Sequence, residues 1–186
     1  MKILAISGSF YPHIGGVALV VQRIGEEIVK RGHEYTVLTV NPGNFASEEF
    51  FRGINIIRVK NNPSITYGIN VSIWQKLKEL IDNYDIIHIH GYHSLLSLES
   101  AFICKRMGKP FVFSPHYHGV GHTLCRDFLM KIYKHFGKFS FRWAEKIICV
   151  SDYEKNLLLH HFNGLNTKAN VIPNGVDQIS IPENQS

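Results

Sequence analysis

The sequence predicts an α/β protein with a doubly wound, mainly parallel open sheet of about seven strands and helices on both faces, a Rossmann-like arrangement. Short, continuously apolar runs rich in Ile and Val recur along the chain, as expected of parallel strands covered on both faces. Segments with apolar residues at helical spacing separate most of these runs. Of the 186 residues, 45% are hydrophobic, so the chain can bury one full core.

The first part of the chain alternates a strand, a helix and two strands. The run KILAIS at 2–7 is apolar and β-branched, which favours a buried strand. In 17–31 apolar side chains recur at i, i+3, i+4, i+7 and i+11, the pattern of an amphipathic helix. Strands are expected again at 35–40 (YTVLTV) and 55–60 (NIIRVK). Between them, residues 41–53 show no periodicity and are expected to form a surface loop.

The rest of the chain repeats helix and strand four times. The pattern SDYE, Ser151 to Glu154, fits a capping box and marks the start of the last helix. After Asp177 the residues are polar and without periodicity, so we expect one domain over 1–177 and a tail or severed interdomain linker over 178–186. The expected helices are at about 71–83, 94–107, 123–143 and 152–162, and the expected strands at 85–90, 111–115, 146–151 and 170–173.

Composition narrows the class of protein. The formal net charge of +5 permits an acidic partner, such as phosphate or anionic lipid, and no nucleic-acid partner is expected. The three cysteines (Cys104, Cys125 and Cys149) form no CxxC pair, which argues against a disulfide framework or a zinc knuckle and favours a cytoplasmic setting. No apolar run approaches the roughly 20 residues that span a bilayer. The first ten residues, MKILAISGSF, hold too short a run for a signal peptide.

The loop SGSFYPHIGGV, between the first strand and the first helix, is a candidate phosphate site. Open parallel sheets bind ligands at the carboxyl ends of their strands. Gly15 and Gly16 lack side chains, so backbone N–H groups and the positive end of the helix can approach a phosphate. A simple tight turn explains the Gly-Gly pair as well. The loop has no GxGxxG pattern and the second strand ends in Asn41 rather than an acid, which disfavours a dinucleotide oxidoreductase.

Six of the eleven histidines fall in two stretches, IIHIHGYH and PHYHGVGH, at the ends of two expected strands. His88 and His90 lie two apart on a strand and so share a face, with His88 deeper and better explained as a buried, hydrogen-bonded histidine. His116 follows the next strand, where an imidazole can donate to an anion or move a proton. His118 and His122 lie on the loop, where solvated side chains are the default.

The two His-x-His pairs raise the alternative of a zinc site. Acids near them are few, since Asp85 opens its strand and Asp127 lies a helical turn or more away. Catalytic zinc sites usually add a carboxylate or cysteine ligand, so no metal is predicted, and an HxH metal hydrolase stays the weaker alternative.

The helix expected at 123–143 has a basic side and an aromatic side. Two interpretations stay open. The helix lies on an anionic membrane surface, or it faces the core while its lysines reach water and Gly137 weakens its middle. The basic side holds Lys131, Lys134, Lys138 and Arg142, and the other side holds Phe128, Ile132, Phe136 and Trp143.

Taken in order, YPHIGGV, DIIHIHGYHS, PFVFSPHYHG, IICVSDYEKNLL and VIPNGVD resemble the N-terminal half of GT-B glycosyltransferases of the retaining family 4 type. The resemblance runs from Met1 to Asp177. It implies an acceptor-side, Rossmann-like domain that faces a C-terminal domain holding the nucleotide-sugar donor. That second domain and its paired glutamates are missing here, so the domain alone is expected to be inactive. A free-standing phosphate- or sugar-binding module that pairs with a separate subunit stays an alternative.

The resemblance also implies roles for single residues. His116 matches a catalytic histidine that reaches the transferring sugar or its phosphate, and Gly15 and Gly16 match the loop that approaches the donor diphosphate. The implied donor substrate is a nucleotide-diphosphate sugar with no further cofactor, and the expected acceptor is a sugar or a lipid-linked molecule. The basic helix at 123–143 is the ground for a lipid-linked acceptor, and the protein is expected in the cytoplasm, in peripheral contact with the inner membrane face. The acceptor side is expected to include His88, His90, Tyr92 and His118, and the crossing between domains Asn174 and Gly175.

Overall fold

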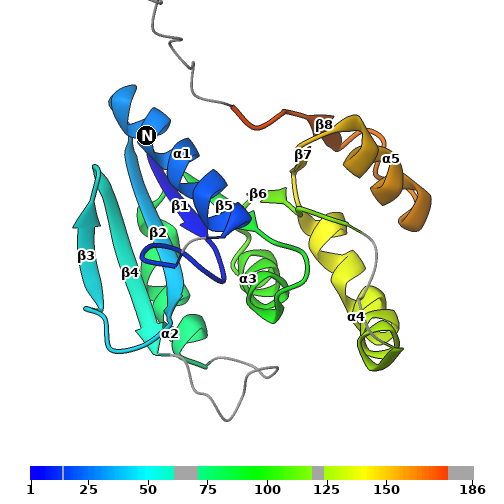
Figure 1. Ribbon diagram of the computed structural model, residues 1–186, viewed down its shortest axis with the longest axis horizontal. Helices are drawn as coiled ribbons and strands as arrows, with labels where there is room; N and C mark the ends of the chain where they lie inside the picture. Colours follow the sequence, from blue (N-terminus) through cyan, green and yellow to red (C-terminus); the bar gives the residue numbers. More distant parts are fainter. Residues whose placement is uncertain (14, 61–70, 119–123, 176–186) are drawn as a thin grey trace, which may run out of the picture.

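The computed structural model describes residues 1–13, 15–60, 71–118 and 124–175, and for 124–132 and 134 it describes the backbone but not the side chains (Figure 1). The expected tail at 178–186 and the loop histidine His122 therefore lie outside the described residues. In chain order the elements are β1 (Lys2–Ile6), α1 (Gly16–Lys30), β2 (Glu34–Asn41), β3 (Glu48–Phe51), β4 (Ile54–Lys60), α2 (Val71–Leu80), the 3-10 helix η2 (Ile81–Asn83), β5 (Ile86–His90), α3 (Leu95–Arg106), β6 (Phe111–Ser114), α4 (Leu124–Trp143), β7 (Lys146–Cys149), α5 (Asp152–His161) and β8 (Ala169–Val171).

The described strands form one sheet in the order β3-β4-β2-β1-β5-β6-β7-β8. All neighbouring strands pair in parallel except β3 and β4. The order reverses beside β1, as it does in a doubly wound fold, and the predicted fold class is confirmed. The seven expected strands and five expected helices are all present, with bounds that differ by a few residues.

The loop expected at 41–53 is in part a strand, and this prediction was wrong. Residues Glu48–Phe51 pair antiparallel with β4, with Phe51 opposite Ile54. The connection is the two-residue turn Arg52-Gly53, whose φ angles of 51° and 83° are the left-handed values that a tight hairpin needs. Four residues with alternating exposure on a sheet edge leave too short an apolar pattern to recognise.

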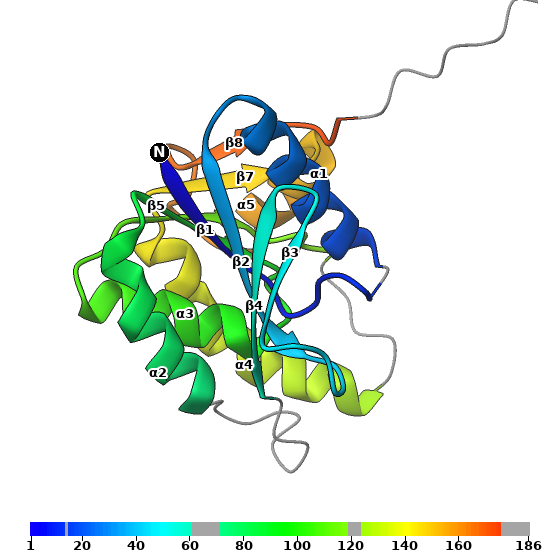
Figure 2. The same ribbon diagram turned by 90° about the vertical axis from the view of Figure 1, so that its left-hand side faces the viewer.

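Two core clusters lie on opposite faces of the sheet. Figure 2 shows α1 on the side of the sheet opposite α2 and α3. On the α1 side, Val21 packs with Ile3 and Ala5 of β1. On the other side, Leu4 and Ile6 pack with side chains from α2 to α5, among them Ile73, Ile103, Phe141 and Leu158. The alternation along β1 therefore separates the two faces.

Helix α4 runs unbroken past Gly137, the residue of low helix propensity that the sequence places in its middle. Gly137 is buried, and a Cβ built there would lie 2.6 Å from Oη of Tyr92. The glycine is needed because the Tyr92 ring approaches the helix backbone. Phe136, on the aromatic side of the expected helix, is 55% exposed, whereas Phe141 is buried.

Candidate functional site

The site is built from loops at the carboxyl ends of β1, β5, β6 and β7, which meet at one edge because these strands are parallel neighbours. The loop after β1 lies against the loop after β5, since a Cβ on Gly8 would lie 3.3 Å from Oγ of Ser94. Arg58 of β4, which is 3% exposed, holds the first loop by donating to the Tyr11 carbonyl over 2.8 Å. The first loop is thus held at two points along its course.

The N-terminus of α1 is open. Gly15 is its N-cap in an extended conformation, without a side-chain cap or an acid in the first turn. A Cβ on Gly16 would meet nothing within 4 Å, whereas one on Gly25 of the same helix would lie 2.7 Å from Tyr35 and Ile54. Packing within the described residues therefore explains why position 25 is a glycine but not why position 16 is one. The N–H groups of this first turn carry the partial positive charge of the helix.

The register of the sheet places His88 and His90 on the same face as α1. His88 is level with Ala5 of β1, which packs against α1, and Ile86 on the same face of β5 contacts that cluster too. His88 is 8% exposed and its Nε2 is 2.8 Å from Oγ of Ser114, which confirms a buried, hydrogen-bonded histidine. His90 is 1% exposed, and neither of its ring nitrogens has a hydrogen-bond partner within the described ranges.

Burial sets the protonation state of His88, His90 and His116. It lowers the pKa of His88 to about 4, with a smaller effect from the neighbouring His116. Burial, followed by the neighbouring histidines, also lowers the pKa of His90 well below its usual value. The pKa of His116 is lowered by burial too. All three imidazoles are therefore neutral at pH 7, each with one N–H donor and one acceptor nitrogen.

His116 stands directly after β6 in a left-handed backbone conformation, with φ at 48°. Its ring is nearly parallel to that of His90, with centroids 5.8 Å apart and an interplanar angle of 17°. Its Nε2 has no hydrogen-bond partner in the part of the chain that the structure describes. Non-glycine residues take this backbone conformation seldom, mostly where surrounding contacts enforce it, and such residues cluster at functional sites.

The contacts that enforce it come from both sides of His116. Before it, the N–H of Tyr92 donates to the Pro115 carbonyl over 2.7 Å. After it, the N–H of Tyr117 donates to the Glu154 carboxylate over 2.6 Å. Glu154 was recognisable in the sequence as part of a capping box, and the structure confirms that its N–H donates to Ser151 Oγ. Its link to Tyr117 depends on how two distant loops meet and has no signal in the sequence.

The remaining acceptor-side candidates separate into exposed and buried groups. His118 is exposed and stacks on His93 with centroids 4.2 Å apart, a neighbour to which the sequence assigned no role. Tyr92 is fully buried, with its ring edge-on to Tyr117. Tyr92 therefore lies beneath the loops instead of lining their surface. His93 was visible as the third histidine of its stretch, but only the fold shows its pairing with His118.

The end of β8 carries the two residues expected at a domain crossing. Asn174 and Gly175 are exposed, and a Cβ on Gly175 would meet nothing within 4 Å. They follow Ile172, whose N–H continues the pairing with β7 by donating to the Cys149 carbonyl. They leave the sheet at the same edge as the other loops.

Metal binding finds no support in this geometry. Among the side chains that the structure describes, no three from His, Cys, Asp or Glu are arranged to hold a metal ion. The His90 and His116 rings are stacked, with an interplanar angle of 17°, whereas the His88 and His90 rings are tilted by 37°.

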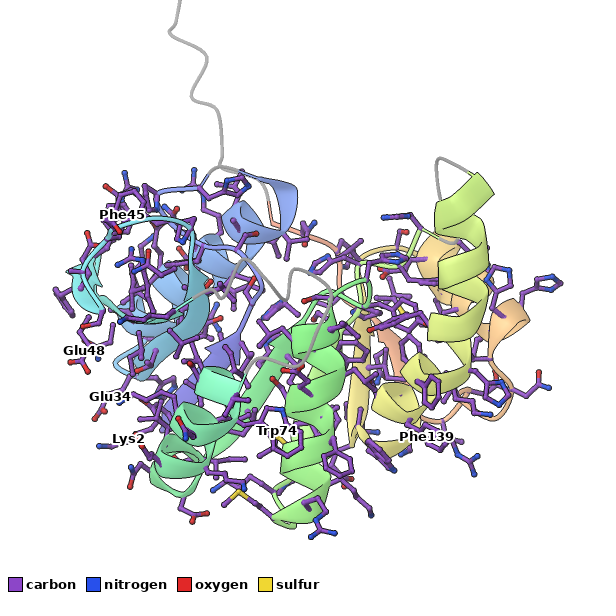
Figure 3. The ribbon with its side chains drawn as sticks, turned by 90° about the horizontal axis from the view of Figure 1, so that it is seen from below. Lys2, Glu34, Phe45, Glu48, Trp74 and Phe139 are labelled. Carbon is purple, nitrogen blue, oxygen red and sulfur yellow. The ribbon has the colours of Figure 1, made fainter. Side chains whose placement is uncertain are left out.

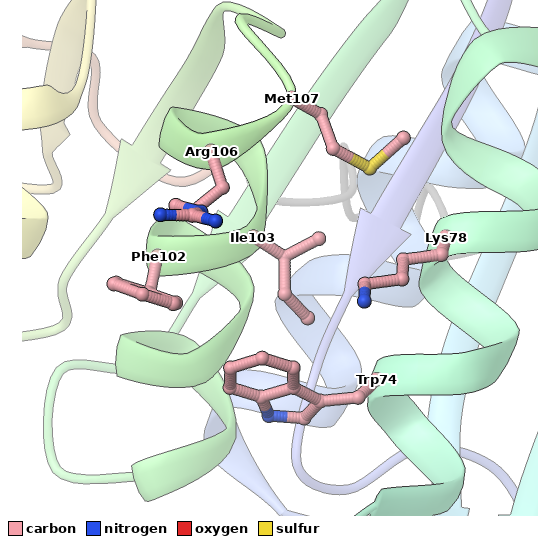
Figure 4. Close-up of a pocket in the computed structure, with 6 residues that line it drawn as sticks. All are labelled: Trp74, Lys78, Phe102, Ile103, Arg106 and Met107. Carbon is pink, nitrogen blue, oxygen red and sulfur yellow. The ribbon is translucent and has the colours of Figure 1, made fainter.

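A separate groove of about 310 Å³ lies between α2 and α3, away from the histidines (Figure 4). Trp74 and Lys78 reach into it from α2 and Ile103 from α3, with Phe102, Arg106 and Met107 around them.

Among the helices that the structure describes, none is long and apolar enough to cross a membrane.

Comparisons with known proteins agree with this architecture. The sequence profile of Glycosyltransferase Family 4 matches residues 14–178. An uncharacterised glycosyltransferase of Methanocaldococcus jannaschii is 30% identical over 183 residues, which are 96% of this chain and 48% of that protein. The alpha-monoglucosyldiacylglycerol synthase of Streptococcus pneumoniae is 23% identical over 186 residues, covering 95% of this chain and 41% of that protein.

A likeness of fold is found with Anabaena HepE, whose crystal structure is in complex with UDP. The TM-score is 0.69 and the identity 19%, over 95% of this chain and 45% of that one. The chain thus spans about half the length of the relatives it matches or somewhat less.

Proposed function

The chain belongs to glycosyltransferase family 4, and from this premise we propose that it forms the N-terminal, acceptor-side half of a nucleotide-sugar-dependent glycosyltransferase of GT-B fold. One observation carries the proposal furthest. His116 stands in a left-handed conformation at the carboxyl edge of the sheet, stacked on His90, which shares a sheet face with the open N-terminus of α1. The C-terminal half would hold the nucleotide. The complex of the similar HepE with UDP supports a nucleotide-sugar donor.

In this proposal the first turn of α1 faces the donor diphosphate. Glycosyl transfer passes through an oxocarbenium-like transition state while negative charge grows on the leaving nucleoside diphosphate. The N–H groups at Gly15 and Gly16 and the positive helix end stabilise that charge, and Gly16 leaves room for the phosphate. His116, neutral at pH 7, donates one hydrogen bond from its ring to the sugar or to the phosphate oxygen.

The acceptor would bind over the loops after β5 and β6. We assign direct contact to His118, which is exposed, and a supporting place beneath it to His88, His90 and Tyr92, which are buried. Asn174 and Gly175 would lead into the second domain.

A binding and activity screen tests this function. The chain is titrated by calorimetry with UDP, GDP and their sugar conjugates, and the full-length gene product is assayed for sugar transfer with the same donors. We expect weak or no nucleotide binding by the chain and transfer by the full-length protein. Tight binding by the chain would indicate a free-standing nucleotide-binding module, and no transfer from any nucleotide sugar would contradict the proposal.

A surface strip of aromatic side chains supports peripheral contact with a membrane, where a lipid-linked acceptor would be found. We define the aromatic strip as Trp74, Phe102, Trp143 and Phe139, which run in this order from α2 across α3 to α4. Successive ring centroids along it lie 5.3 to 6.1 Å apart. Figure 3 looks onto this side, with Trp74 over α2 and α3 and Phe139 on α4.

Cations accompany the aromatic strip. Lys78 Nζ lies 5.8 Å from the Trp74 ring centroid, and Lys138 Nζ lies 5.5 Å from that of Phe139. Arg106 and Arg142 on α3 and α4 are exposed. Aromatic rings beside cations suit the interface of an anionic membrane, where rings reach the headgroup level and cations contact the lipid phosphates. We therefore propose peripheral contact with the cytoplasmic membrane face through this strip.

Vesicle pelleting tests this contact. The protein is mixed with anionic or neutral phospholipid vesicles, and Phe102→Ser is compared with Phe50→Ser, which removes an exposed ring on β3 away from the strip. We expect Phe102→Ser to lower binding to anionic vesicles about tenfold, because one partly exposed ring no longer enters the interface. Equal loss in both variants, or no preference for anionic vesicles, would contradict the contact.

A further inference from the structure

Glu154 is a buried carboxylate whose placement is explained only in part by the helix it begins. It is 3% exposed and lies in the first turn of α5. A capping box would direct its side chain back to the N–H of Ser151, the N-cap. Instead one oxygen accepts from Val150 N–H and the other from Tyr117 N–H, both over 2.6 Å. The second bond joins α5 to the loop after β6, which is 37 residues away in sequence.

The bond reaches the peptide group that follows His116. That peptide's N–H belongs to Tyr117, and its orientation is set by the ψ angle of His116. The peptide group before His116 is fixed separately, because the Pro115 carbonyl accepts from Tyr92 N–H over 2.7 Å. With both flanking peptides held, His116 is left in its rare conformation at φ 48° and its ring lies over His90.

Helix α5 holds Tyr117 at a second point. The Tyr117 hydroxyl is 2.7 Å from Nδ1 of His161, in the last turn of α5. Tyr117 is 3% exposed, and its ring meets Tyr92 and Phe162. The two ends of α5 thus bracket one residue of the loop, so a shift of α5 relative to the sheet moves the residue next to His116.

We propose that Glu154 is a positioning residue for His116, with its carboxylate acting through the Tyr117 peptide to hold the imidazole over His90. The inference rests on the proposed function, in which His116 reaches the transferring sugar or its phosphate. An ionised carboxylate binds two N–H groups more strongly than a neutral oxygen does. A misplacement of about 1 Å at a reacting group can cost about a hundredfold in rate.

Glu154→Gln and Ser151→Ala form a matched pair. The Gln side chain keeps one acceptor oxygen and turns an NH₂ group toward the other N–H, so one of the two bonds is lost. Ser151→Ala removes the cap on Glu154 N–H but leaves the link to Tyr117. In the full-length gene product we expect Glu154→Gln to lower kcat about 10- to 100-fold with the donor KM little changed. Ser151→Ala is expected to keep kcat within about twofold while lowering the melting temperature.

Nuclear magnetic resonance on the chain itself separates this inference from the proposed function. We expect Glu154→Gln to move the Tyr117 amide and His116 imidazole signals, and Ser151→Ala to leave them in place. If the wild-type full-length protein transfers no sugar, the proposed function fails and these spectra alone decide the positioning. Glu154→Asp, which keeps the charge but shortens its reach, replaces the Gln variant if that one does not fold. Equal kcat losses in both variants, or unmoved His116 signals in the Glu154 variant, would overturn the inference.

Discussion

Gly16→Ala is predicted to weaken donor binding without lowering the stability of the fold. Gly16 is the first residue of α1, and its added methyl group would meet nothing within 4 Å. The substitution also reduces the freedom of the unfolded chain and improves helix propensity. We therefore expect the free energy of unfolding to stay level or rise by up to about 1 kcal/mol.

The same methyl group has a different consequence for the donor. In the proposed complex it projects toward the diphosphate that the first turn faces. One extra methyl group in a closely fitting site costs about 1–3 kcal/mol, a factor of about 10 to 200. Because the phosphate is bound in both ground state and transition state, we expect a higher donor KM and a lower kcat/KM in the full-length protein.

Gly25→Ala is the matched control in the same helix. Its Cβ would lie 2.7 Å from side-chain atoms of Tyr35 and Ile54, an overpacking that costs about 1–3 kcal/mol of stability. Urea denaturation and steady-state kinetics are measured on both variants. A Gly16→Ala protein with unchanged kcat/KM, or one that is destabilised as much as Gly25→Ala, would refute the reasoning that this glycine serves a ligand.

Further predictions concern the histidines and Gly137. His88 is neutral in the folded protein with a pKa of about 4, against 6.5 for an ordinary histidine, so the unfolded state takes up its proton first as the pH falls. In urea denaturation, stability should be full above about pH 6.5 and decline toward pH 4, with about 3 kcal/mol of the loss from His88 and a further loss from His90 and His116, whose pKa values burial also lowers. A flat profile would mean that these histidines are not buried. Gly137→Ala should lower the free energy of unfolding by about 1–3 kcal/mol despite its better helix propensity, since the methyl group meets Tyr92; a stabilised variant would contradict that contact. Tyr92→Phe should change stability by less than about 1 kcal/mol, because the Tyr92 hydroxyl has no hydrogen-bond partner among the described residues, and a larger loss in thermal denaturation would reveal one.

The sequence was informative where a pattern extends over several residues. Apolar strands and helical spacing predicted the architecture. Because His88 and His90 lie two residues apart on a strand, the sequence also predicted correctly that they share a face of the sheet. The spacing of the two histidines could not show that this face is the one covered by α1, because that depends on the register of β5 against β1. It also missed β3, whose four residues carry two charges and pair only on a sheet edge.

Tertiary contacts between distant segments could not be predicted from the sequence. Gly137 was judged by helix propensity alone, but its place in α4 follows from the approach of Tyr92 across the core. Glu154 was visible as a capping residue, while its bond to Tyr117 requires the loops after β6 and β7 to meet. Burial of His90 likewise follows from its neighbours in space and not from its position at a strand end.

The most direct test of the proposed role of His116 in sugar transfer is the transfer rate of the full-length gene product with His116→Ala, compared with His118→Ala on the same loop. The proposed roles predict transfer from a nucleotide sugar by the wild type and a loss in kcat of about 100-fold or more on removal of His116. His118→Ala should act mainly on the acceptor KM, because in the proposed complex its exposed ring contacts the acceptor and not the donor. A His116→Ala protein that transfers sugar at the wild-type rate would contradict the proposed role of His116.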